Sequence, residues 1–529
     1  MSGRAGVVVI GGGLAGITAA IALREAGADV TVLEARPRLG GATCSFSRGG
    51  LVVDNGQHVF LRCCTAYRGL LARLGMTGAV SLQDRFDVTV LRPGGRARLR
   101  RTALPGPLHM GKALTGYSFL SVTQRMRVGQ AALAMAALNP AREDLDQVRL
   151  GDWLAARGQD ERTRRLLWDL FTVSALNVAG DDANLALAAT VVKTALLGAR
   201  DAADIGVPAI PLGDLHGRAA GTLLARLGGQ VRLGAKAVAV EALAPGSGAH
   251  ADAGAAGEPG GRFRVRLTER GAEAAIEADG VVLAVPPHVA ARLVPGGTVT
   301  AGGPGPAQWR ELATSPIVNV HVIYDRRVTR LPFAAGVDSP VQWVFDRTGP
   351  SGLRSGQYLA VSLSAADEYV DVPAAELREA FLPAMAELFP AARGARVTDF
   401  FVTRERRATL RQVPGCGRLR PGAATALPGL VLAGAWTDTG WPDTMEGAVR
   451  SGLNAVRELR RGLAVAGVPA RAGAPAPAHQ ASPGQTSPPA SVNGRPRREP
   501  PSTVSDKAGA GSAADAGGAG RTSDLGGTA

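Results

Sequence analysis

A glycine pattern near the N-terminus restricts the fold of this chain more than any other feature of its sequence. The pattern G-x-G-x-x-G occupies residues 11–16, directly after the apolar run Val7–Ile10. A short apolar run bounded by glycine is typical of a buried parallel strand, and Leu14–Ala26 is typical of a helix. With a second strand over Asp29–Leu33, these segments predict a βαβ unit at the start of the chain.

Each glycine of the pattern has a physical task in such a unit. Gly11 permits a tight turn, Gly13 lets the backbone approach a pyrophosphate, and Gly16 allows close packing of helix on strand. The helix N-terminus at Leu14 and Ala15 offers free N–H groups and a partial positive charge to phosphates. The spacing therefore predicts a dinucleotide site.

An acidic residue stands where the ribose of a dinucleotide would need it. Glu34 ends the second predicted strand, eighteen residues after Gly16. A carboxylate there can accept hydrogen bonds from the adenosine ribose hydroxyls. Because strand, glycine turn, helix and acid follow in order, a bound dinucleotide is favoured over a glycine-rich turn without a ligand.

Length and charge limit the domain count and the partners. The chain has 529 residues, of which 46% are hydrophobic and 20% are charged, which is typical of a globular protein with two or three domains. The net charge of +14 favours anionic partners such as phospholipid surfaces. We find no nucleic-acid motif, and aromatic residues make up only 4%, so we expect no nucleic-acid partner.

The cysteines and the apolar runs indicate a cytoplasmic protein. Cys44, Cys63, Cys64 and Cys416 form no C-x-x-C pair, so we expect reduced thiols and no metal site. The uncharged run Val7–Leu23 is better explained by the nucleotide-binding turn than by a signal peptide. No other run is long and apolar enough to span a bilayer.

The rest of the chain alternates between sheet-like and helical patterns. The segment 244–261 is rich in Gly and Ala and is typical of a mobile hairpin loop. Residues 469–529 are rich in Ala, Pro, Gly and Ser, which predicts a disordered tail. We expect strands at 80–101, 229–240, 263–267, 281–285 and 430–433, helices over most of 108–200 and at 447–459, and a second sheet within 315–410.

Two further segments narrow the ligand. Arg38-Leu39-Gly40-Gly41 follows Glu34, and residues 430–452 read LVLAGAWTDTGWPDTMEGAVRSG. The first resembles the R-x-G-G element, and the second the C-terminal flavin motif, of the flavin amine oxidase and phytoene desaturase superfamily. The resemblance implies FAD, with the paired glycines under its pyrophosphate and a helix N-terminus facing the flavin. Beyond the first glycine turn and Glu34, the implied FAD-binding residues are Ala35, Arg36, Gly40, Gly41, Ala42, Val238, Gly434, Thr444, Met445 and Glu446.

The fold class expected from these features is α/β with an α+β insert. A Rossmann-type FAD-binding domain is predicted from residues 1–90, 205–290 and 415–465. A discontinuous substrate domain of helices and a second sheet is predicted from residues 91–204 and 291–414. At one position the chain departs from the superfamily, because Ala435 stands where many members carry an acid. In those members the acid binds the ribitol or phosphate of the cofactor. Here Asp438 or a water molecule is the expected substitute for it.

A closer resemblance rests on two other segments. Asp54-Asn55-Gly56-Gln57-His58 and the run 444–452, TMEGAVRSG, closely resemble the hydroxysqualene dehydroxylase family of bacterial hopanoid pathways, over about residues 6–460. The resemblance implies that an allylic hydroxyl is protonated and leaves as water, while reduced flavin delivers hydride, so that hydroxysqualene becomes squalene. It also implies a long apolar isoprenoid substrate and neighbouring enzymes of the squalene pathway. Because the chain has no second dinucleotide fingerprint, we expect an external electron donor.

Few side chains in these segments can do acid–base chemistry. His58 is the candidate for protonating the leaving hydroxyl. A hydrogen bond within the fold or to the cofactor is the alternative role for this histidine. Asp54 and Gln57 share its neighbourhood, where polar core contacts are the alternative.

The C-terminal motif holds further candidates with two roles each. Glu446 either complements the dipole of the last helix or contacts the flavin. Trp436 and Trp441 either pack against the flavin or lie in the core. Asp438 and Asp443 are weaker candidates.

A substrate of this kind resides in membranes, so a membrane-facing surface is expected. The arginine-rich segment Arg92–Arg101, with apolar residues around 104–120, is the candidate, and a solvated hairpin is the alternative. We therefore expect a cytoplasmic protein with a peripheral contact to the inner face of the cell membrane. Three other functions stay open: a carotenoid-type desaturase, an amine oxidase, and a prenyl-binding escort protein without redox activity.

Overall fold

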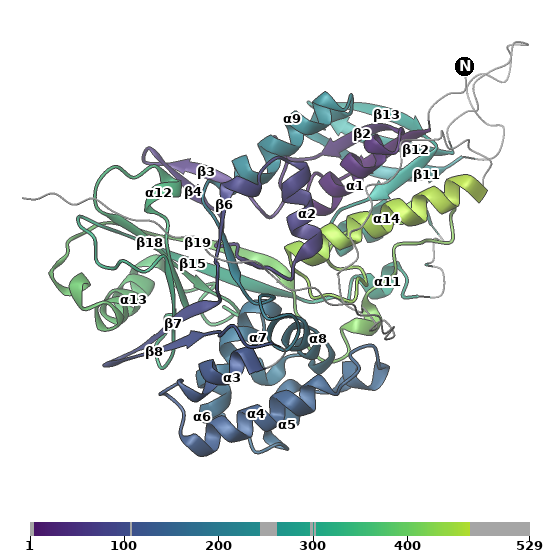
Figure 1. Cartoon of the computed structure of the whole chain (residues 1–529). Coiled ribbons are helices and arrows are strands. Elements are labelled where there is room, and N and C mark those ends of the chain that lie inside the picture. Colours follow the sequence, from purple (N-terminus) through teal and green to yellow (C-terminus); the bar gives the residue numbers. More distant parts are fainter. Residues whose placement is uncertain (1–4, 106–107, 244–261, 297–299, 301–302, 466–529) are drawn as a thin grey trace, which may run out of the picture. The chain divides into compact units, whose positions relative to one another are not determined.

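The protein is described from a computed structural model, in which residues 5–105, 108–243, 262–296, 300 and 303–465 are described (Figure 1). The chain divides into two units, Met1–Ala474 and Pro475–Ala529, and the second lies outside the described residues. The expected loop at 244–261 and the expected tail at 469–529 also lie outside them. All that follows concerns the first unit.

A five-stranded parallel sheet carries the N-terminal βαβ unit. Its order is β10-β2-β1-β14-β20, so the first strand of the chain is central. β1, β14 and β20 are short, apolar and buried, as expected for strands covered on both faces, whereas the edge strand β10, with sequence QVRL, is partly exposed. The strands are β1 (Gly6–Ile10), β2 (Asp29–Glu34), β10 (Gln230–Leu233), β14 (Gly280–Leu283) and β20 (Leu430–Leu432).

The alternating side chains of β1 divide between two hydrophobic cores. Val7 and Val9 pack among helices, whereas Val8 and Ile10 pack on a three-stranded antiparallel sheet. The result is a three-layer unit (Figure 1). The helical layer holds α1 (Leu14–Glu25), α2 (Thr65–Arg73), α9 (Ala219–Arg226) and α14 (Met445–Val465), and the opposite layer holds β11 (Ala235–Ala242), β12 (Phe263–Glu269), β13 (Ala272–Ala278), α10 (Pro287–Leu293) and α11 (Pro306–Trp309).

A second, seven-stranded sheet is built from the middle of the chain in the order β19-β15-β18-β17-β16-β7-β8. Helix α13 (Ala374–Leu388) covers one of its faces. The strands are β7 (Asp87–Arg92), β8 (Gly95–Arg100), β15 (Thr314–Tyr324), β16 (Phe333–Gly336), β17 (Trp343–Asp346), β18 (Gln357–Leu363) and β19 (Val397–Leu410), with the short helix α12 (Thr348–Ser351) between β17 and β18.

The largest core joins part of this second sheet to a helical layer. Val88 and Val90 of β7 and Ala97 and Leu99 of β8 face that layer. The helices are α3 (Leu108–Thr115), α4 (Val122–Ala136), α5 (Leu150–Ala155), α6 (Glu161–Thr163), α7 (Asp169–Leu176) and α8 (Leu185–Val191). The predicted helical region 108–200 and the predicted second sheet are therefore confirmed.

Two small sheets link the larger ones. The hairpin of β3 (Ser45–Arg48) and β4 (Leu51–Asp54) follows the first βαβ unit, and β9 (Ile205–Pro208) lies between β5 (Phe60–Leu61) and β6 (Val80–Leu82). The sequence pattern predicted β6, which lies within the expected strand region 80–101, and it missed β3, β5 and β9. The mixture of a parallel sheet, an antiparallel sheet and helices confirms the α/β fold class, while the division into two domains stays a prediction.

The structure corrects the predicted membrane-facing segment Arg92–Arg101 at one residue. Arg101 is buried and donates to both carboxylate oxygens of Asp204, at 2.6 and 2.9 Å. Arg98 and Arg100 remain on the surface, where both pair with Asp87. Arg101 is therefore excluded from any membrane-facing surface. No helix in the described ranges is both long and apolar enough to cross a membrane.

Candidate functional site

The glycine turn after β1 is closed to any side chain. Gly11 has φ +108°, and a Cβ there would lie 2.2 Å from the carbonyl oxygen of Ala284. A Cβ on Gly16 would lie 1.9 Å from the carbonyl oxygen of Gly11. The two glycines thus let β1, β14 and α1 meet at backbone contact distance, as the motif predicts.

The N-terminus of α1 is open for an anion. Gly13 is the N-cap residue and provides no side-chain cap, and the first turn holds no acidic residue. The first N–H groups of a helix have no intrahelical partner. Those at Leu14 and Ala15 can therefore bind phosphate oxygens, favoured by the helix dipole.

The second pair of glycines lies across the first turn. The Gly40 N–H donates to the Gly12 carbonyl at 2.8 Å. Gly41 has φ +57°, and a Cβ on it would lie 2.8 Å from the Cα of Gly13. Arg38 closes this crossing by donating to the Gly41 carbonyl at 3.0 Å. The two glycine turns, here called the glycine cradle (residues 11–16 and 40–42), form one continuous backbone surface.

Glu34 lies beside the cradle and is buried. One of its carboxylate oxygens accepts from the Gly12 N–H at 2.7 Å, and the other accepts from the Arg36 N–H at 2.8 Å. Each oxygen keeps a lone pair, so both can still accept ribose hydroxyls. Ala35, Arg36 and Ala42 have exposed side chains and line the edge of the cradle through their backbone.

Val238 lies at a bulge in β11, between two register positions that pair Ala237 and Ala239 with β12. A bulged residue is left out of the strand ladder. Its peptide groups are therefore available to a ligand such as adenine, whatever the side chain. The Val238 side chain is 43% exposed.

The C-terminal motif packs directly on the cradle. Gly452 of α14 lies so close to α1 that a Cβ would be 2.4 Å from the Ala15 carbonyl oxygen. Gly434 has φ +134°, and its N–H donates to the Ser451 hydroxyl at 2.9 Å. The Thr444 hydroxyl accepts from the Gly447 N–H at 3.3 Å and caps α14 ahead of Met445. Two helix N-termini thus border one site.

The loop after Gly434 is held by a buried arginine. Arg420 donates to the carbonyl oxygens of Ala435, Thr437 and Trp441 at 2.7 to 3.0 Å. This arginine occupies the neighbourhood of Ala435. Asp438, the substitute suggested by the sequence, is exposed and accepts from the N–H of Gly440 at 3.0 Å within its own turn.

The other candidates of this motif have structural partners. The Trp436 indole donates to the Val285 carbonyl at 2.9 Å, and the Trp441 ring lies under Arg450. Asp443 accepts from the Leu410 N–H at 2.6 Å, and burial raises the pKa of its carboxyl.

Glu446 caps a helix, but not the one that the sequence suggested. Its carboxylate accepts from the N–H groups of Ala66 and Tyr67, at 3.2 and 2.8 Å, in the first turn of α2. It also accepts from the Arg450 guanidinium at 2.8 Å. The buried carboxylate therefore joins α14 to α2 and complements the dipole of α2.

The segment Asp54–His58 connects the cradle to the second sheet. Asp54 accepts from Arg347 at 2.5 Å in a buried ion pair. The Asn55 amide donates to the Ala42 carbonyl at 2.8 Å and to the Glu405 carboxylate, on β19, at 3.0 Å. The segment therefore contacts both sides of the site.

His58 is neutral at neutral pH. Burial lowers the pKa of its imidazole, opposed in part by a hydrogen bond with the Gly56 carbonyl. The Nδ1–O distance is 3.2 Å. Because a carbonyl oxygen can only accept, Nδ1 carries the proton and Nε2 is left as an acceptor.

Several polar residues of the second sheet reach this segment and were not predicted. The Asn319 amide donates to the Asn55 carbonyl at 3.3 Å. His321, two residues along β15, bonds Tyr358 and Thr403 at 2.8 and 3.0 Å, and burial lowers its pKa to about 3. The available signal was the run PIVNVHVIY, in which Asn and His alternate with apolar residues.

Two buried polar atoms in or beside the segment lack a hydrogen-bond partner among the described residues. They are Nε2 of Gln57 and Oδ1 of Asn319, and His216 lies close by. Nε2 of His216 bonds the Tyr67 hydroxyl at 2.8 Å, and burial lowers the pKa of His216 to about 3. A buried unpaired polar atom costs free energy unless a ligand or water binds it. We take this cluster as part of the site.

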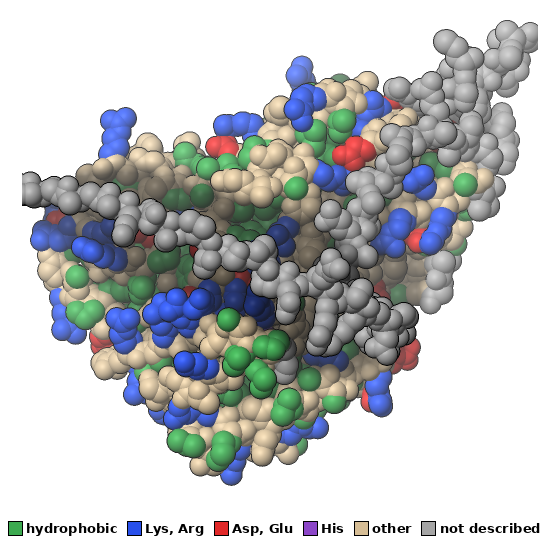
Figure 2. All heavy atoms as spheres, in the orientation of Figure 1, with side chains coloured by type: hydrophobic (Ala, Val, Ile, Leu, Met, Phe, Trp, Pro, Cys, Tyr) green, Lys and Arg blue, Asp and Glu red, His purple; other side chains and the backbone are tan. Residues whose placement is uncertain are grey.

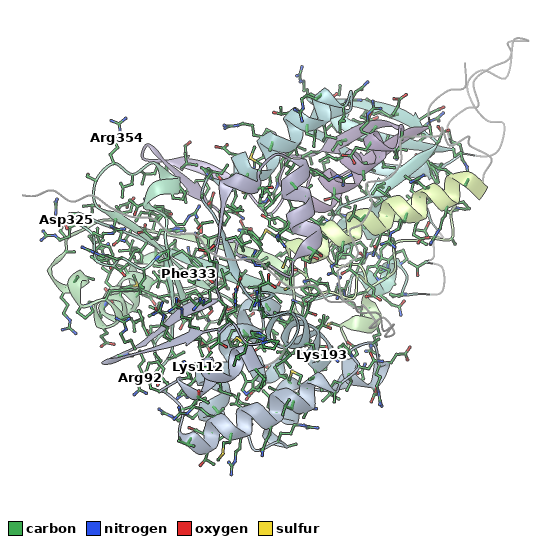
Figure 3. All side chains as sticks on the ribbon, in the orientation of Figure 1. Arg92, Lys112, Lys193, Asp325, Phe333 and Arg354 are labelled. Carbon is green, nitrogen blue, oxygen red and sulfur yellow. The ribbon has the colours of Figure 1, made fainter. Side chains whose placement is uncertain are left out.

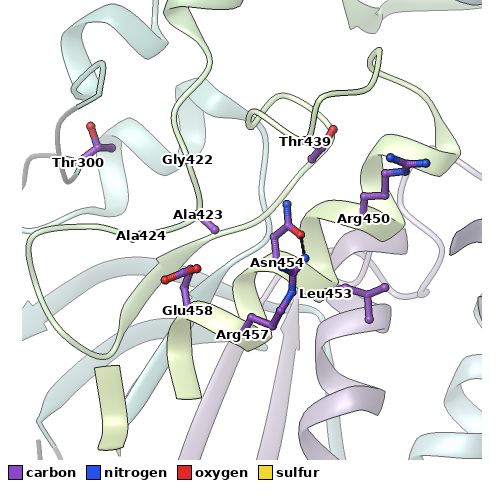
Figure 4. A pocket seen from close by; sticks show the side chains of 10 residues that line it. All are labelled: Thr300, Gly422, Ala423, Ala424, Thr439, Arg450, Leu453, Asn454, Arg457 and Glu458. Carbon is purple, nitrogen blue, oxygen red and sulfur yellow. Dashed lines mark hydrogen bonds between the residues drawn. The ribbon is translucent and has the colours of Figure 1, made fainter. Parts of the chain in front are cut away.

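A separate pocket of about 630 Å³ lies beside α14 (Figure 4). Arg450, Asn454 and Arg457 line it, together with Thr300 and the backbone at 422–424. None of its lining residues belongs to the glycine cradle. Because the phosphate-binding geometry is at the cradle, we place the candidate site there and not in this pocket.

Comparison with known proteins supports a flavin-binding role for the glycine cradle. Residues 14–460 match the family of flavin-containing amine oxidoreductases. A hydroxysqualene dehydroxylase of Rhodopseudomonas palustris is 31% identical, over 85% of this chain and 97% of that protein. A zeta-carotene desaturase of Zea mays is 26% identical, over 84% of this chain and 82% of that protein.

A solved structure supports the fold. Putrescine oxidase superposes with a TM-score of 0.62 at 20% identity, over 88% of this chain and 99% of that chain. The cradle, Glu34 and the two helix N-termini form a donor and acceptor set that fits the pyrophosphate and ribose of FAD. The cofactor predicted from the sequence is thereby confirmed, while the individual contacts stay predictions.

Proposed function

The chain belongs to the flavin-containing amine oxidoreductases, and from this premise we propose that it reduces hydroxysqualene to squalene. It is an FAD-dependent oxidoreductase of the squalene and carotenoid desaturase type. The observation that carries the specific reaction is the similarity to a hydroxysqualene dehydroxylase, which extends over 97% of that protein.

The proposed reaction balances with one proton and one hydride ion, which together amount to two protons and two electrons. The substrate hydroxyl takes a proton and leaves as water, and hydride takes its place on the allylic carbon. Bound FAD, reduced by an external two-electron donor, supplies the hydride. The cradle and the N-terminus of α1 would hold the pyrophosphate, and Glu34 the ribose.

The chain must supply the proton, and His58 is the residue we assign to it. An imidazole with a lowered pKa is mostly neutral at neutral pH. Its protonated form, the imidazolium, is a stronger acid and gives up its proton readily. Its protonated fraction grows as the pH falls. We therefore expect the rate of squalene formation to rise below pH 6.5, the ordinary pKa of histidine.

Single-turnover chemistry tests the reaction. FAD-loaded protein would be reduced with dithionite without oxygen, mixed with hydroxysqualene, and followed by flavin absorbance and by analysis of the hydrocarbon. Flavin reoxidation with an equal amount of squalene would support the proposal. Flavin that stays reduced over many minutes would overturn it.

The variant His58→Gln tests whether His58 is the acid, because it removes the imidazole and leaves the rest of the site in place. We expect a rate at least about 100-fold lower, with loss of the rise at low pH and with FAD still bound. A variant with the same pH profile as the unmodified protein would remove His58 as the acid. His288→Gln, at a partly exposed histidine that pairs with Arg407, is the matched control and should keep the pH profile of the unmodified protein.

A carotenoid-type desaturase is the second candidate, favoured by the similarity to zeta-carotene desaturase. Hydride would then move in the opposite direction, from polyene to oxidised FAD. The oxidised protein mixed with a carotene would bleach its flavin under this alternative. Hydroxysqualene would leave the reduced flavin unchanged.

A further inference from the structure

One stretch of the chain holds most of its excess positive charge. Residues 88–142 contain nine Lys and Arg and no Asp or Glu, whereas the net charge of the whole chain is +14. Arg101 is buried against Asp204 and contributes nothing at the surface. The other cations lie on β7, β8, α3 and α4 and in the loops beside them.

Helix α4 exposes an apolar stripe to solvent. Val122, Met126 and Leu133 are 65%, 59% and 62% exposed. Positions four and eleven residues apart lie on the same side of a helix. Val128, Ala131 and Met135 form the opposite, buried side. The stripe therefore faces away from the core that holds this helix.

The same apolar character continues onto Leu108 of α3 and onto Leu104, which precedes it in the chain. Leu104 and Leu108 are 50% and 62% exposed. With the stripe on α4 they make up five of the ten exposed large hydrophobic residues among those described. We call these five residues the α3–α4 surface. Figure 2 shows hydrophobic side chains among Lys and Arg in the lower part of the view, where Figure 1 places these helices.

The cations beside the α3–α4 surface have few acidic partners. Lys112 is exposed one turn after Leu108, and Arg127 is exposed next to Met126 (Lys112 is labelled in Figure 3). Arg125 donates to the backbone carbonyls of Ser121 and Thr115, so its charge is not neutralised by a carboxylate there. Asp160 is an acid beside α4: it accepts from Gln124 at 3.0 Å, and the charge of Arg127 also stabilises its carboxylate.

We propose that the α3–α4 surface docks on a phospholipid bilayer with anionic headgroups. Apolar side chains in a helix face would enter the interface, while Lys112, Arg125 and Arg127 would contact lipid phosphates. The proposal stands on exposure and charge alone, so it does not depend on the identity of the substrate. A protein partner would not require an acid-free stretch of 55 residues around the apolar stripe.

Vesicle flotation of the full-length, FAD-loaded protein tests the proposal. The probes are vesicles of phosphatidylcholine alone and vesicles with equal parts of phosphatidylglycerol. We expect binding to the anionic vesicles, with weaker binding at high salt. Equal binding to both vesicles, or none to the anionic ones, would overturn the proposal.

Two variants probe the two components of the surface. Val122→Ser/Met126→Ser/Leu133→Ser removes the stripe, and we expect it to lose at least about tenfold in lipid partitioning. Lys112→Glu/Arg127→Glu reverses two charges, and we expect a loss of at least about 30-fold, since each basic residue contributes about fivefold. Flavin absorbance verifies that each variant is folded.

Matched controls change the same properties elsewhere. Arg396→Glu/Arg406→Glu alters the net charge equally on β19 and the residue before it, and Leu233→Ser removes an exposed leucine from β10. Both should bind vesicles as the unmodified protein does. If the controls lose as much binding as the α3–α4 variants, or if those variants only dissociate a dimer measured by light scattering, the lipid assignment is wrong.

Discussion

Gly41 and Gly49 share nearly the same backbone conformation, with φ of +57° and +55°. They differ in their surroundings. A Cβ on Gly41 would lie 2.8 Å from Gly13, whereas a Cβ on Gly49 would meet nothing within 4 Å. The pair separates the general cost of a left-handed residue from the specific cost of filling the cradle.

We predict that Gly41→Ala binds FAD at least about tenfold more weakly, because the added methyl group displaces the backbone under the pyrophosphate. Gly49→Ala should lose a similar amount of stability, about 1 kcal/mol, but keep the affinity for FAD. Titration of the apoproteins with FAD measures both. Equal affinities in the two variants would contradict the assignment of the cradle.

At the residue scale, the sequence predicted what depends on neighbours in the chain. The roles of Gly11, Gly16 and Glu34 follow from spacing within one βαβ unit. Arg347 could not be assigned, because its partner Asp54 is 293 residues away in the sequence. Asn319 reaches Asn55 over 264 residues in the same way. Contacts that depend on how two sheets meet leave only a weak signal, such as a polar residue in an apolar strand.

Glu446 shows how one side chain can stabilise an element far from its own in sequence. Its carboxylate accepts hydrogen bonds from two backbone N–H groups of α2 and one from the Arg450 guanidinium. We predict that Glu446→Ala destabilises the protein by about 2 to 3 kcal/mol, because the buried N–H of Tyr67 and the partly buried N–H of Ala66 lose their acceptor.

Glu446→Gln should lose less, since an amide oxygen still accepts. Chemical denaturation with FAD bound measures both variants. If Glu446 contacts the flavin instead, Glu446→Gln would shift the reduction potential of the flavin and leave the stability unchanged. That outcome would contradict the capping role.

Strands were predicted where the signal lies in their own sequence, and one of the missed strands depends on pairing with distant segments. The apolar runs of β1, β2, β14 and β20 are local signals, and all four strands were predicted. The strand β9 was missed because its four residues are held by pairing with β5 and β6. Its sequence, IGVP, contains glycine and proline and so lacks the continuous apolar run that identified β14 and β20.

The buried pair of Asp54 and Arg347 couples the hairpin β3–β4 to the second sheet, so it belongs to the whole molecule. Removing one partner leaves a buried charge unpaired. We predict that Asp54→Asn and Arg347→Met each cost about 3 kcal/mol or more. The double variant should cost clearly less than the sum. Additive losses in a double-mutant cycle would show that the two side chains act independently.

We also expect the free energy of unfolding to depend on pH, because buried groups bind protons differently in the folded and the unfolded chain. Burial lowers the pKa of His216 and His321 to about 3, so between pH 6.5 and 3 the unfolded chain binds more protons at these sites than the folded one. Stability is therefore complete above pH 6.5 and falls as the pH drops. From pH 7 to pH 5 each histidine should remove about 2 kcal/mol.

Asp169 acts in the opposite direction, and the two effects can be measured apart. Burial, assisted by Asp181, raises the pKa of Asp169 to about 7. The folded form then binds the extra proton, so this carboxyl lowers stability as the pH rises from 3.8 to 7. We predict that His321→Gln flattens the rise of stability between pH 5 and 7, while Asp169→Asn steepens it. Urea denaturation at several pH values gives the slopes. Two slopes equal to that of the unmodified protein would show that neither group changes its proton affinity on folding, and the electrostatic account of the core would then be wrong.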